Sequence, residues 1–500
     1  MNLIGPSDFR ARIQGDQMAR LRRYLRRTVL PFSEHYRRVF REHSLLPEDM
    51  RTFDDLSQIP FASKEDLAGS PANPATPREF VLLPDRGVLA KRPSILLQTL
   101  LRGRAAVLRN LEREFRPVFM TSTTGRSADP VPFLYTVHDL NRLSLAGSRL
   151  FEVCGATPEM KVLNMFPYAP HLGFWLAVHG GAAAGVFTLS SGGGKVMGTE
   201  GQLRFLQKLQ PHVLIGMPTF MYHVLHEAAA QSLRLPTLCR IVLGGEKVPD
   251  GLRRKLASLA AECGAPSVEV LATYGFTEAK MAWAECPHPV GAPSPGYHLF
   301  PDMGIVEVVA PDTGTPLPPG HAGEIVFTPL DARGTVVLRY RTGDLIDGGL
   351  HFTRCPRCGR EVPRLLGHIS RRSGMQAMHL DKLKGTLVDF NVLEHILDDL
   401  PGVGAWQIEL RKLHDDPLEL DEIILHIAPI GDATEAQLVH RIDSQFARVE
   451  VHPNRIHFHE AGELRRMQGV GAELKERRLV DHRPSAAMTA PTSSIKEVRR

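Results

Sequence analysis

Residues 121–136, TSTTGRSADPVPFLYT, place hydroxyl side chains beside Gly125, between an apolar approach and a β-prone exit. Glycine permits a close approach of the backbone, so these hydroxyls and the free backbone N–H groups around them could wrap an anion such as a phosphate. The segment is not the GxxxxGK[ST] loop, because no lysine follows Gly125. A polar turn is the alternative interpretation, since loops rich in Ser, Thr and Gly are common.

Two further polar segments follow β-like runs, GGEKVP after Leu243 and YGFTEA after Thr273. From about residue 160, short apolar runs alternate with helical segments; the runs are KVLNMF, GVFTL, HVLIGMP, RIVLGGE and VEVLATYGFTE. This alternation predicts βαβ units and a buried, mostly parallel sheet flanked by helices. Ligands bind such sheets in the loops at the carboxyl ends of the strands, so both polar segments are predicted site loops.

The remaining elements predict an α/β protein with more than one domain, because 500 residues exceed one ordinary core. Residues 1–120 are predicted to be helical, with a Pro-rich interlude. From about residue 303, GIVEVVAPDTGTPLPPGHAGEIVFTP and GTVVLRYRTGDLIDGG predict alternating strands joined by Gly/Pro turns, as in an antiparallel, barrel-like part.

Past about residue 372 the pattern predicts a small α+β domain. Its predicted helices are VLEHILDDL and AQLVHRIDSQFARV, and its predicted strands are AWQIELRK, DEIILHIAP and RIHFHE. We therefore expect a large N-terminal domain over residues 1–370, a small C-terminal domain over 371–484 and a disordered tail over 485–500, where large apolar residues are almost absent.

Four segments occur in a fixed order: TSTTGR (121–126), LGGEKVP (243–249), YGFTEA (274–279) and YRTGDL (340–345). In that order and spacing they resemble the adenylate-forming superfamily of acyl-CoA synthetases and related ligases, and most closely its phenylacetate–coenzyme A ligases. The resemblance runs from about Thr121 to Arg483 and so covers most of the chain. It implies a large ATP- and acid-binding domain followed by a small mobile domain.

The resemblance implies a nucleotide site built from these four segments. TSTTGR is one residue shorter than the family's [TS]SGTTGxP loop, yet its residues would still meet the β- and γ-phosphates. Thr277 would meet the α-phosphate and Glu278 would hold Mg²⁺, a hard cation that prefers carboxylate oxygen. A surface glutamate at a helix start is the alternative for Glu278. The other implied nucleotide contacts are Thr123, Thr124 and Gly125 (phosphates), Gly244, Gly245 and Glu246 (adenine and ribose side), and Tyr274 and Gly275 (adenine).

Asp344 in YRTGDL would accept hydrogen bonds from both ribose hydroxyls, although an aspartate after TG is also an ordinary turn residue. In the domain junction LLGHISRRSGM, Arg371 matches the family's nucleotide-contacting arginine, and Gly374 stands where the family has an acidic hinge. Near the end of the chain, ELKERRLVDHR resembles the family's GKAKRVxDxR, which implies that Lys475 reaches the acid and the α-phosphate. A solvated surface lysine is the alternative.

CPRCGRE (355–361) resembles a zinc-binding segment of phenylacetate–coenzyme A ligase-like proteins. With residues upstream it implies a closed tetrahedral Zn²⁺ site of Cys286, His298, Cys355 and Cys358. His288 is an alternative fourth donor, and a pair of free thiols in a turn is the alternative to any metal. HFHE (457–460) also looks metal-like, but it alternates as a strand does, and we interpret it as structural.

The predicted activity is ATP-dependent activation of a carboxylic acid with transfer to coenzyme A. Residues 167–175 and 216–220, PYAPHLGFW and GMPTF, are expected to line the acid pocket, and their aromatic and small apolar side chains suit an aryl or other apolar acid. Two alternatives stay open: an adenylating enzyme whose acceptor is a carrier-protein thiol, an amine or a reductase, and an inactive nucleotide- or acyl-binding protein.

The composition of the chain limits the classes of partner that we expect it to bind. Hydrophobic content of 43%, charged content of 23% and a net charge of +5 are typical of a soluble globular protein and argue against nucleic-acid binding. The basic run RLRRYLRRT (20–28) predicts a helix whose arginines face solvent or, alternatively, an anionic surface. The longest apolar stretch, residues 174–189, is shorter than a membrane span and is interrupted by His179, so a cytoplasmic location is expected.

Overall fold

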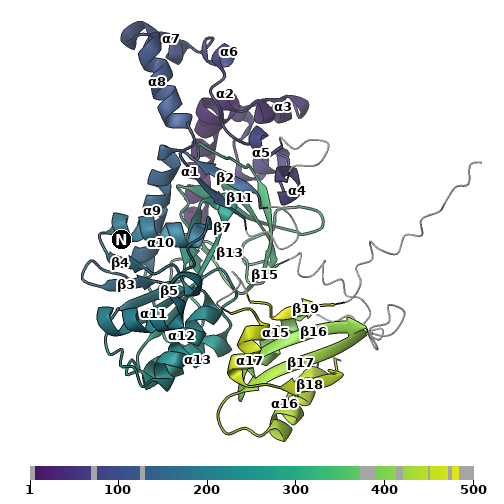
Figure 1. Cartoon of the computed structure of the whole chain (residues 1–500). Helices are drawn as coiled ribbons and strands as arrows, with labels where there is room; N and C mark the ends of the chain where they lie inside the picture. The colour runs from purple at the N-terminus through teal and green to yellow at the C-terminus, as the bar shows by residue number, and fades with distance from the viewer. Residues whose placement is uncertain are drawn as a thin grey trace, which may run out of the picture. The chain divides into compact units, whose positions relative to one another are not determined.

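The computed structural model describes residues 6–68, 76–123, 130–371, 390–412, 421–448, 451–470 and 476–482. The chain divides into two compact units, unit 1 (Met1–Arg372) and unit 2 (Ser373–Arg500) (Figure 1). No helix among the described residues is long and apolar enough to cross a membrane.

A six-stranded sheet with the order β4–β3–β5–β6–β7–β8 carries the predicted βαβ units of unit 1. Five strands are parallel: β3 (Lys161–Asn164), β4 (Phe187–Ser190), β5 (Val213–Gly216), β6 (Arg240–Leu243) and β7 (Glu269–Phe276). β8 (Met281–Ala284) pairs antiparallel with β7. Four helices alternate with the parallel strands along the chain: α10 (Leu172–Ala184), α11 (Gly194–Leu209), α12 (Pro218–Ala230) and α13 (Asp250–Glu262). The predicted α/β fold class is confirmed.

Apolar residues at helical spacing fix these helices against the sheet. In α13, Leu252, Leu256 and Leu259 are three and four residues apart, are at most 6% exposed and belong to one cluster with Ile241 and Val270 of the sheet. Burying each such leucine stabilises the fold by about 1.5–3 kcal/mol.

Helices α9 (Val137–Val153) and α10 approach each other closely because both carry glycine at the crossing. A Cβ added to Gly147 would lie 2.5 Å from the Cα of Gly180, so any side chain at this position would push the helices apart.

The N-terminal part of unit 1 is mainly helical, as predicted. Leu21, Tyr24, Leu25 and Val29 are buried, while Arg20 and Arg23 are exposed, so the basic run does lie on the outer face. The segments are α1 (Pro6–Tyr24), η1 (Leu25–Val29), α2 (Leu30–Phe32), α3 (Glu34–Glu42), η2 (Pro47–Asp49), η3 (Phe53–Gln58), α4 (Lys64–Leu67), α5 (Thr76–Glu79), α6 (Arg86–Leu89), α7 (Pro93–Arg102) and α8 (Arg104–Phe115). A two-stranded hairpin, β1 (Phe119–Ser122) with β2 (Pro132–Tyr135), then leads into α9.

Two smaller antiparallel sheets complete unit 1. One has the order β10 (Gly304–Val309), β11 (Gly323–Pro329), β12 (Tyr340–Ile346) and β15 (Ile369–Arg371), and the other β13 (Leu350–His351), β14 (Arg364–Leu365) and β9 (Tyr297–His298). The predicted strand across GTVVLRY was wrong at its start, because β12 begins only at Tyr340. Arg339 has a φ of 45°, outside the strand region, and Val336 N–H donates to Phe80 O instead of to a neighbouring strand.

Unit 2 is an α+β unit with a mixed four-stranded sheet, in the order β18 (Arg455–Phe458), β17 (Asp421–Pro429), β16 (Val403–Lys412) and β19 (Leu479–Asp481). Its helices are α15 (Phe390–Asp399), α16 (Glu435–Ala447) and α17 (Ala461–Met467). Trp406 is 2% exposed in its core, and its indole N–H donates to Asp398 Oδ1 at 2.9 Å.

Candidate functional site

The loops after β5 and β6 are tied to each other and to β7. Glu246, in the loop after β6, accepts a 2.7 Å hydrogen bond from the hydroxyl of Thr219 at the start of α12. Gly244 lies so close to β7 that a Cβ there would meet Thr273 Oγ1 at 2.3 Å. Gly245 has a φ of 86°, which favours glycine. These contacts bring Gly244, Gly245 and Glu246 to the carboxyl end of the parallel sheet.

Tyr274 near the end of β7 connects the parallel sheet to β12. Its hydroxyl donates to Asp344 Oδ2 at 2.8 Å. The ring is buried and lies against Trp283 of β8, with ring centroids 6.0 Å apart. Burial and the neighbouring Asp344 charge raise the pKa of Tyr274, so the phenol stays a neutral donor.

Asp344 is the centre of this polar group. It is 5% exposed, and its second oxygen, Oδ1, lies 2.8 Å from Nε of Arg371. The two residues face each other in register on β12 and β15. The predicted ribose-binding carboxylate and the predicted nucleotide-contacting arginine are therefore brought together.

Glu278 lies on the 3₁₀ turn η4 (Thr277–Ala279) that follows β7 directly, together with Thr277. Its Oε1 accepts a 2.7 Å hydrogen bond from the hydroxyl of Tyr340, the first residue of β12. Burial raises the pKa of Glu278, although this hydrogen bond acts in the opposite direction. A carboxylate in this setting gains from a bound cation, which would offset its desolvation.

A buried ion pair holds the turn that carries Thr277 and Glu278. Lys280 is 7% exposed, and its ammonium lies 3.3 Å from Oδ2 of Asp139 and donates to Leu134 O at 2.8 Å. Asp139 also accepts from the backbone N–H groups of Thr136, Arg333 and Gly334 at 2.7–2.9 Å. The turn is thus fixed to α9 and to the β1–β2 hairpin.

Sequence reasoning missed these positioning residues. The position of Lys280 directly after the predicted YGFTEA segment could have indicated its role. Its partner Asp139, however, is far away in the sequence and lies in no motif. Tyr340 was part of the YRTGDL segment, yet nothing in the sequence assigned it to Glu278.

The base of the Ser/Thr/Gly loop is formed by Thr123. Its backbone N–H donates to Val131 O at 3.1 Å, and its hydroxyl accepts from Val131 N–H at 3.0 Å. Ser122 N–H donates to Pro170 O at 2.7 Å, so the loop begins beside the predicted acid-pocket segment. Thr124, Gly125, Gly374 and Lys475 lie outside the described residues.

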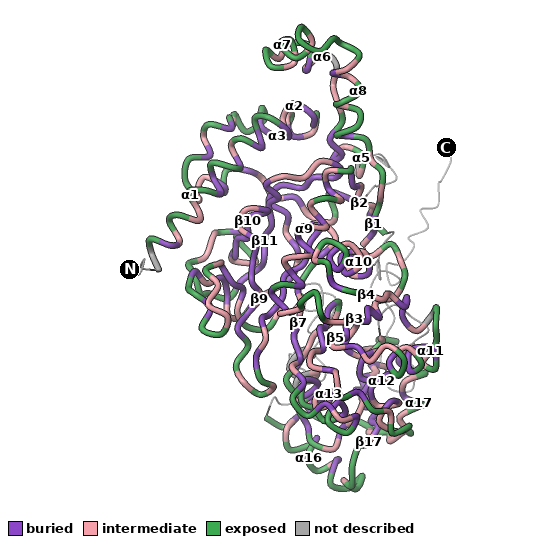
Figure 2. Tube along the Cα trace, turned by 90° about the vertical axis from the view of Figure 1, so that its left-hand side faces the viewer, coloured by how far each residue is buried: buried purple, intermediate pink, exposed green. Residues whose placement is uncertain are grey.

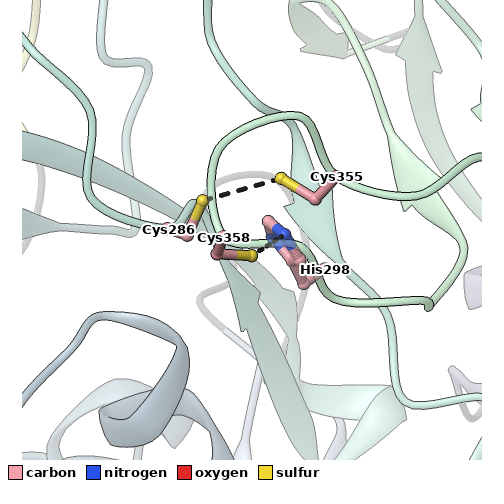
Figure 3. A group of neighbouring side chains, drawn as sticks. All are labelled: Cys286, His298, Cys355 and Cys358. Carbon is pink, nitrogen blue, oxygen red and sulfur yellow. Dashed lines mark hydrogen bonds between the residues drawn. The ribbon is translucent and has the colours of Figure 1, made fainter.

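The four predicted zinc ligands converge from three segments (Figure 3). Cys286 follows β8, His298 ends β9, and Cys355 and Cys358 lie in the turn between β13 and β14. Their ligand atoms all lie within 4.8 Å of one another. The predicted alternative His288 is not in this group; its Nδ1 lies 2.9 Å from Cys286 O.

The geometry of the cluster fits zinc. Tetrahedral Zn²⁺ with Zn–S bonds of about 2.3 Å separates two sulfurs by about 3.8 Å, and the Sγ atoms of Cys286 and Cys355 are 3.8 Å apart. Cys358 Sγ lies 3.3 Å from His298 Nε2. Nδ1 of His298 lies 3.2 Å from Ala284 O, which orients the ring so that Nε2 faces the sulfurs. Burial lowers the pKa of His298 to about 4, so the imidazole is neutral, as a ligand must be.

Known proteins resemble this chain over most of its length. The model of a family described as AMP-binding enzyme matches residues 140–329. A phenylacetate–coenzyme A ligase of Thermus thermophilus is 28% identical over 406 residues, 80% of this chain and 78% of that protein. One from Pseudomonas putida is 24% identical over 452 residues, 89% of this chain and 90% of that protein.

A solved structure shares the fold. The crystal structure of 2-hydroxyisobutyryl-CoA ligase in the postadenylation state, in complex with 2-HIB-AMP, has a TM-score of 0.72 and 18% sequence identity, and the match covers 93% of this chain and 89% of that one.

Proposed function

Because the chain belongs to the adenylate-forming superfamily, in its phenylacetate–coenzyme A ligase-like branch, we propose that it activates a carboxylic acid with ATP and transfers the acyl group to coenzyme A. First, a carboxylate oxygen bonds to the α-phosphorus of ATP and pyrophosphate leaves, giving an acyl-adenylate. Then the thiol sulfur attacks the acyl carbon, the bond to AMP breaks and AMP leaves. The protein contributes positioning and charge neutralisation and needs no covalent nucleophile.

The observation that carries this proposal is the Asp344 carboxylate between Tyr274 and Arg371. A buried carboxylate with two oriented partners can accept hydrogen bonds from the two ribose hydroxyls. The guanidinium of Arg371, next to this carboxylate, would place a positive charge near the nucleotide. The resemblance gives Tyr274 a place near adenine, and its ring is fixed by contacts with Phe276 and Trp283.

Glu278 is the proposed Mg²⁺ ligand. Its carboxylate is oriented by Tyr340, and its turn is anchored by Lys280 and Asp139. Bound Mg²⁺ neutralises polyphosphate charge. Thr277 on the same turn would contact the α-phosphate.

An aryl or other apolar acid is the proposed substrate class. In the predicted acid-pocket segment, Tyr168 and Phe174 meet edge to face at 5.3 Å, and Trp175 meets Phe119 at 5.0 Å. Tyr168 is 63% exposed, so part of this aromatic cluster can contact a ligand. Aromatic walls favour apolar ligands because they gain from burial of their surface.

We propose that the Cys/His cluster binds a structural Zn²⁺ rather than a catalytic one. The four side chains offer one ligand atom each, so a tetrahedral Zn²⁺ bound by all of them would have no position left for water or substrate. Metal analysis of the purified chain is expected to find stoichiometric zinc, and a metal-free, fully active and stable chain would contradict this assignment.

Unit 2 is proposed to be the small mobile domain of the family, with Lys475 acting in adenylation. Lys475→Ala is expected to abolish acyl-adenylate formation and to leave thioester formation from supplied acyl-adenylate largely intact. Each half-reaction can be measured separately by product chromatography. Equal loss of both half-reactions would contradict the role given to Lys475.

The proposed function itself is tested by product analysis. Purified chain incubated with ATP, Mg²⁺, coenzyme A and each of a panel of aryl and alkyl acids is expected to form an acyl-CoA and AMP, identified by mass spectrometry. Acyl-adenylate without a CoA thioester would support the alternative in which a carrier protein, amine or reductase is the acceptor. ATP binding without either product would support the inactive binding protein, for which the shortened TSTTGR loop is the observation in favour.

A further inference from the structure

Helices α7 and α8 form a helical hairpin that extends from the rest of unit 1 in both views (Figures 1 and 2). The outer helix, α7, exposes four leucines to solvent. Their exposed fractions are 55% for Leu96, 58% for Leu97, 83% for Leu100 and 73% for Leu101. Single exposed leucines are ordinary, but four on one short helix form a patch that needs an explanation.

The four leucines share one face of α7. They lie one, four and five residues apart, which spans about 140° of the helix at 100° per residue. Ile95 is partly buried and packs against the core, and Thr99, four residues on, is also less exposed than its neighbours. The helix therefore uses its Ile95–Thr99 side for the fold and leaves its leucine side without a packing role among the described residues.

The charged residues of the segment that contains α7 and most of α8 have one sign. Residues 86–111 contain no Asp or Glu and six basic residues: Arg86, Lys91, Arg92, Arg102, Arg104 and Arg109. Lys91 just before α7, Arg102 at its last position and Arg104 just after it are exposed.

Arg92 connects the hairpin to the basic run at the N-terminus. Its guanidinium donates to the backbone carbonyls of Arg26 and Arg27, at 2.5 and 3.3 Å. Arg26 and Arg27 are themselves exposed. Arg92 thus joins the basic residues of the hairpin to the basic run of α1 and η1.

We propose that the α7–α8 hairpin binds an anionic lipid surface, with the α7 leucines inserted at the headgroup–acyl boundary and the arginines on the lipid phosphates. An amphipathic helix binds such surfaces because its apolar face is buried in the membrane interface and its flanking cations are attracted to the anionic lipids. A second copy of the chain is a poorer occupant, because a two-fold contact would set the same six cations against one another. The inference does not rest on the proposed enzymatic function.

Co-sedimentation of the full chain with vesicles tests this proposal. The chain is expected to sediment with vesicles of equimolar phosphatidylglycerol and phosphatidylcholine and to stay in solution with phosphatidylcholine alone. The double variant Leu100→Ser/Leu101→Ser and the double variant Arg102→Glu/Arg104→Glu are each expected to lower the bound-to-free ratio about tenfold or more. Salt of about 1 M, where the Debye length is about 3 Å, should release the wild type.

Matched controls separate this surface from a general effect. Leu46→Ser replaces a leucine that is 60% exposed elsewhere, and Arg204→Glu/Lys208→Glu reverses two charges on α11. Both are expected to bind anionic vesicles nearly like the wild type. The substituted residues of α7 and α8 are exposed, so the melting temperature of each variant should stay unchanged. The proposal would be overturned if the wild type and the leucine variant sedimented equally, or if the wild type did not sediment. An acidic protein or a second copy of the chain would then be the better candidate for this surface.

Discussion

The β7–β8 hairpin contributes to two clusters of opposite character. From β7 and its turn come Tyr274 and Glu278, whose hydrogen-bond partners are the Asp344 carboxylate and the Tyr340 hydroxyl. Just after β8 comes Cys286, whose partners are two thiols and an imidazole aimed at one point. The polar cluster has contacts that a ligand's hydroxyls and phosphates can replace or extend, while the Cys/His cluster is already complete.

This difference distinguishes residues that can contact a ligand from residues that stabilise the fold. In the polar cluster the carboxylates are held by a few directional bonds, and the Arg371 side chain is 61% exposed, so it can contact a ligand. In the Cys/His cluster three of the four side chains are buried, and together they offer the four ligand atoms that a tetrahedral metal site needs. Changes in the first region should alter rates, and changes in the second should alter stability.

The largest effect is expected at the buried Lys280–Asp139 pair, which anchors the turn that carries Thr277 and Glu278. Lys280→Met leaves Asp139 charged and buried without its partner, which should lower the free energy of unfolding by about 3–5 kcal/mol. Urea unfolding measures this change, with Lys208→Met as a control on an exposed helix position. A loss below about 0.5 kcal/mol would mean that the pair does not anchor the turn.

Asp344→Ala should chiefly affect activity. Loss of two charge-assisted hydrogen bonds to a nucleotide ribose is worth about 3 kcal/mol, so the adenylation rate at low ATP should fall about 100-fold. The exposed Asp54→Ala provides the control, and thermal unfolding checks that both variants are folded. An Asp344→Ala chain with normal adenylation would separate this carboxylate from the nucleotide.

Cys355→Ser should have the opposite profile. We expect loss of bound zinc and a lower free energy of unfolding, by about 2 kcal/mol, with adenylation per folded molecule retained at low temperature. Cys239→Ser is the matched control, because this thiol lies outside the cluster and donates to a backbone carbonyl, His212 O, at 3.3 Å. Full zinc occupancy in Cys355→Ser would contradict the ligand assignment.

The smallest effect concerns pH. Burial acts to raise the pKa of Asp139, but the charge of Lys280 and three backbone N–H groups outweigh it and hold the pKa below its ordinary value. A depressed pKa adds stability that is present above the unfolded-state pKa and is lost as the pH falls through the folded-state pKa. Asp139→Asn should therefore flatten the decrease in stability below about pH 4. An unchanged acid limb in that variant would contradict this contribution.

The sequence pattern predicted the alternating strands and helices, because burial in the sheet or against it sets the periodicity of their apolar residues. The family resemblance implied Tyr274, Glu278 and Asp344 from the ordered segments and Arg371 from the junction LLGHISRRSGM, and the structure brings these residues together in one region. The helix α17 and the strand β19 were not predicted, because both are short and their positions depend on contacts with β16.

The contacts that hold the site could not be predicted, since they join residues distant in the sequence. Lys280 pairs with Asp139, and Tyr340 with Glu278, across different sheets and helices. The sequence also left His288 and His298 both open as donors. Strand pairing decides between them, because β9 pairs with β14 and so carries His298 to the Cys turn.

Carboxylate-dependent exchange of pyrophosphate into ATP, measured without coenzyme A across aryl and alkyl acids, tests the proposed adenylation. We expect exchange with at least one apolar acid, and its loss in Asp344→Ala but not in Cys355→Ser. A chain that binds ATP but exchanges pyrophosphate with no acid would contradict adenylation and leave a nucleotide-binding protein.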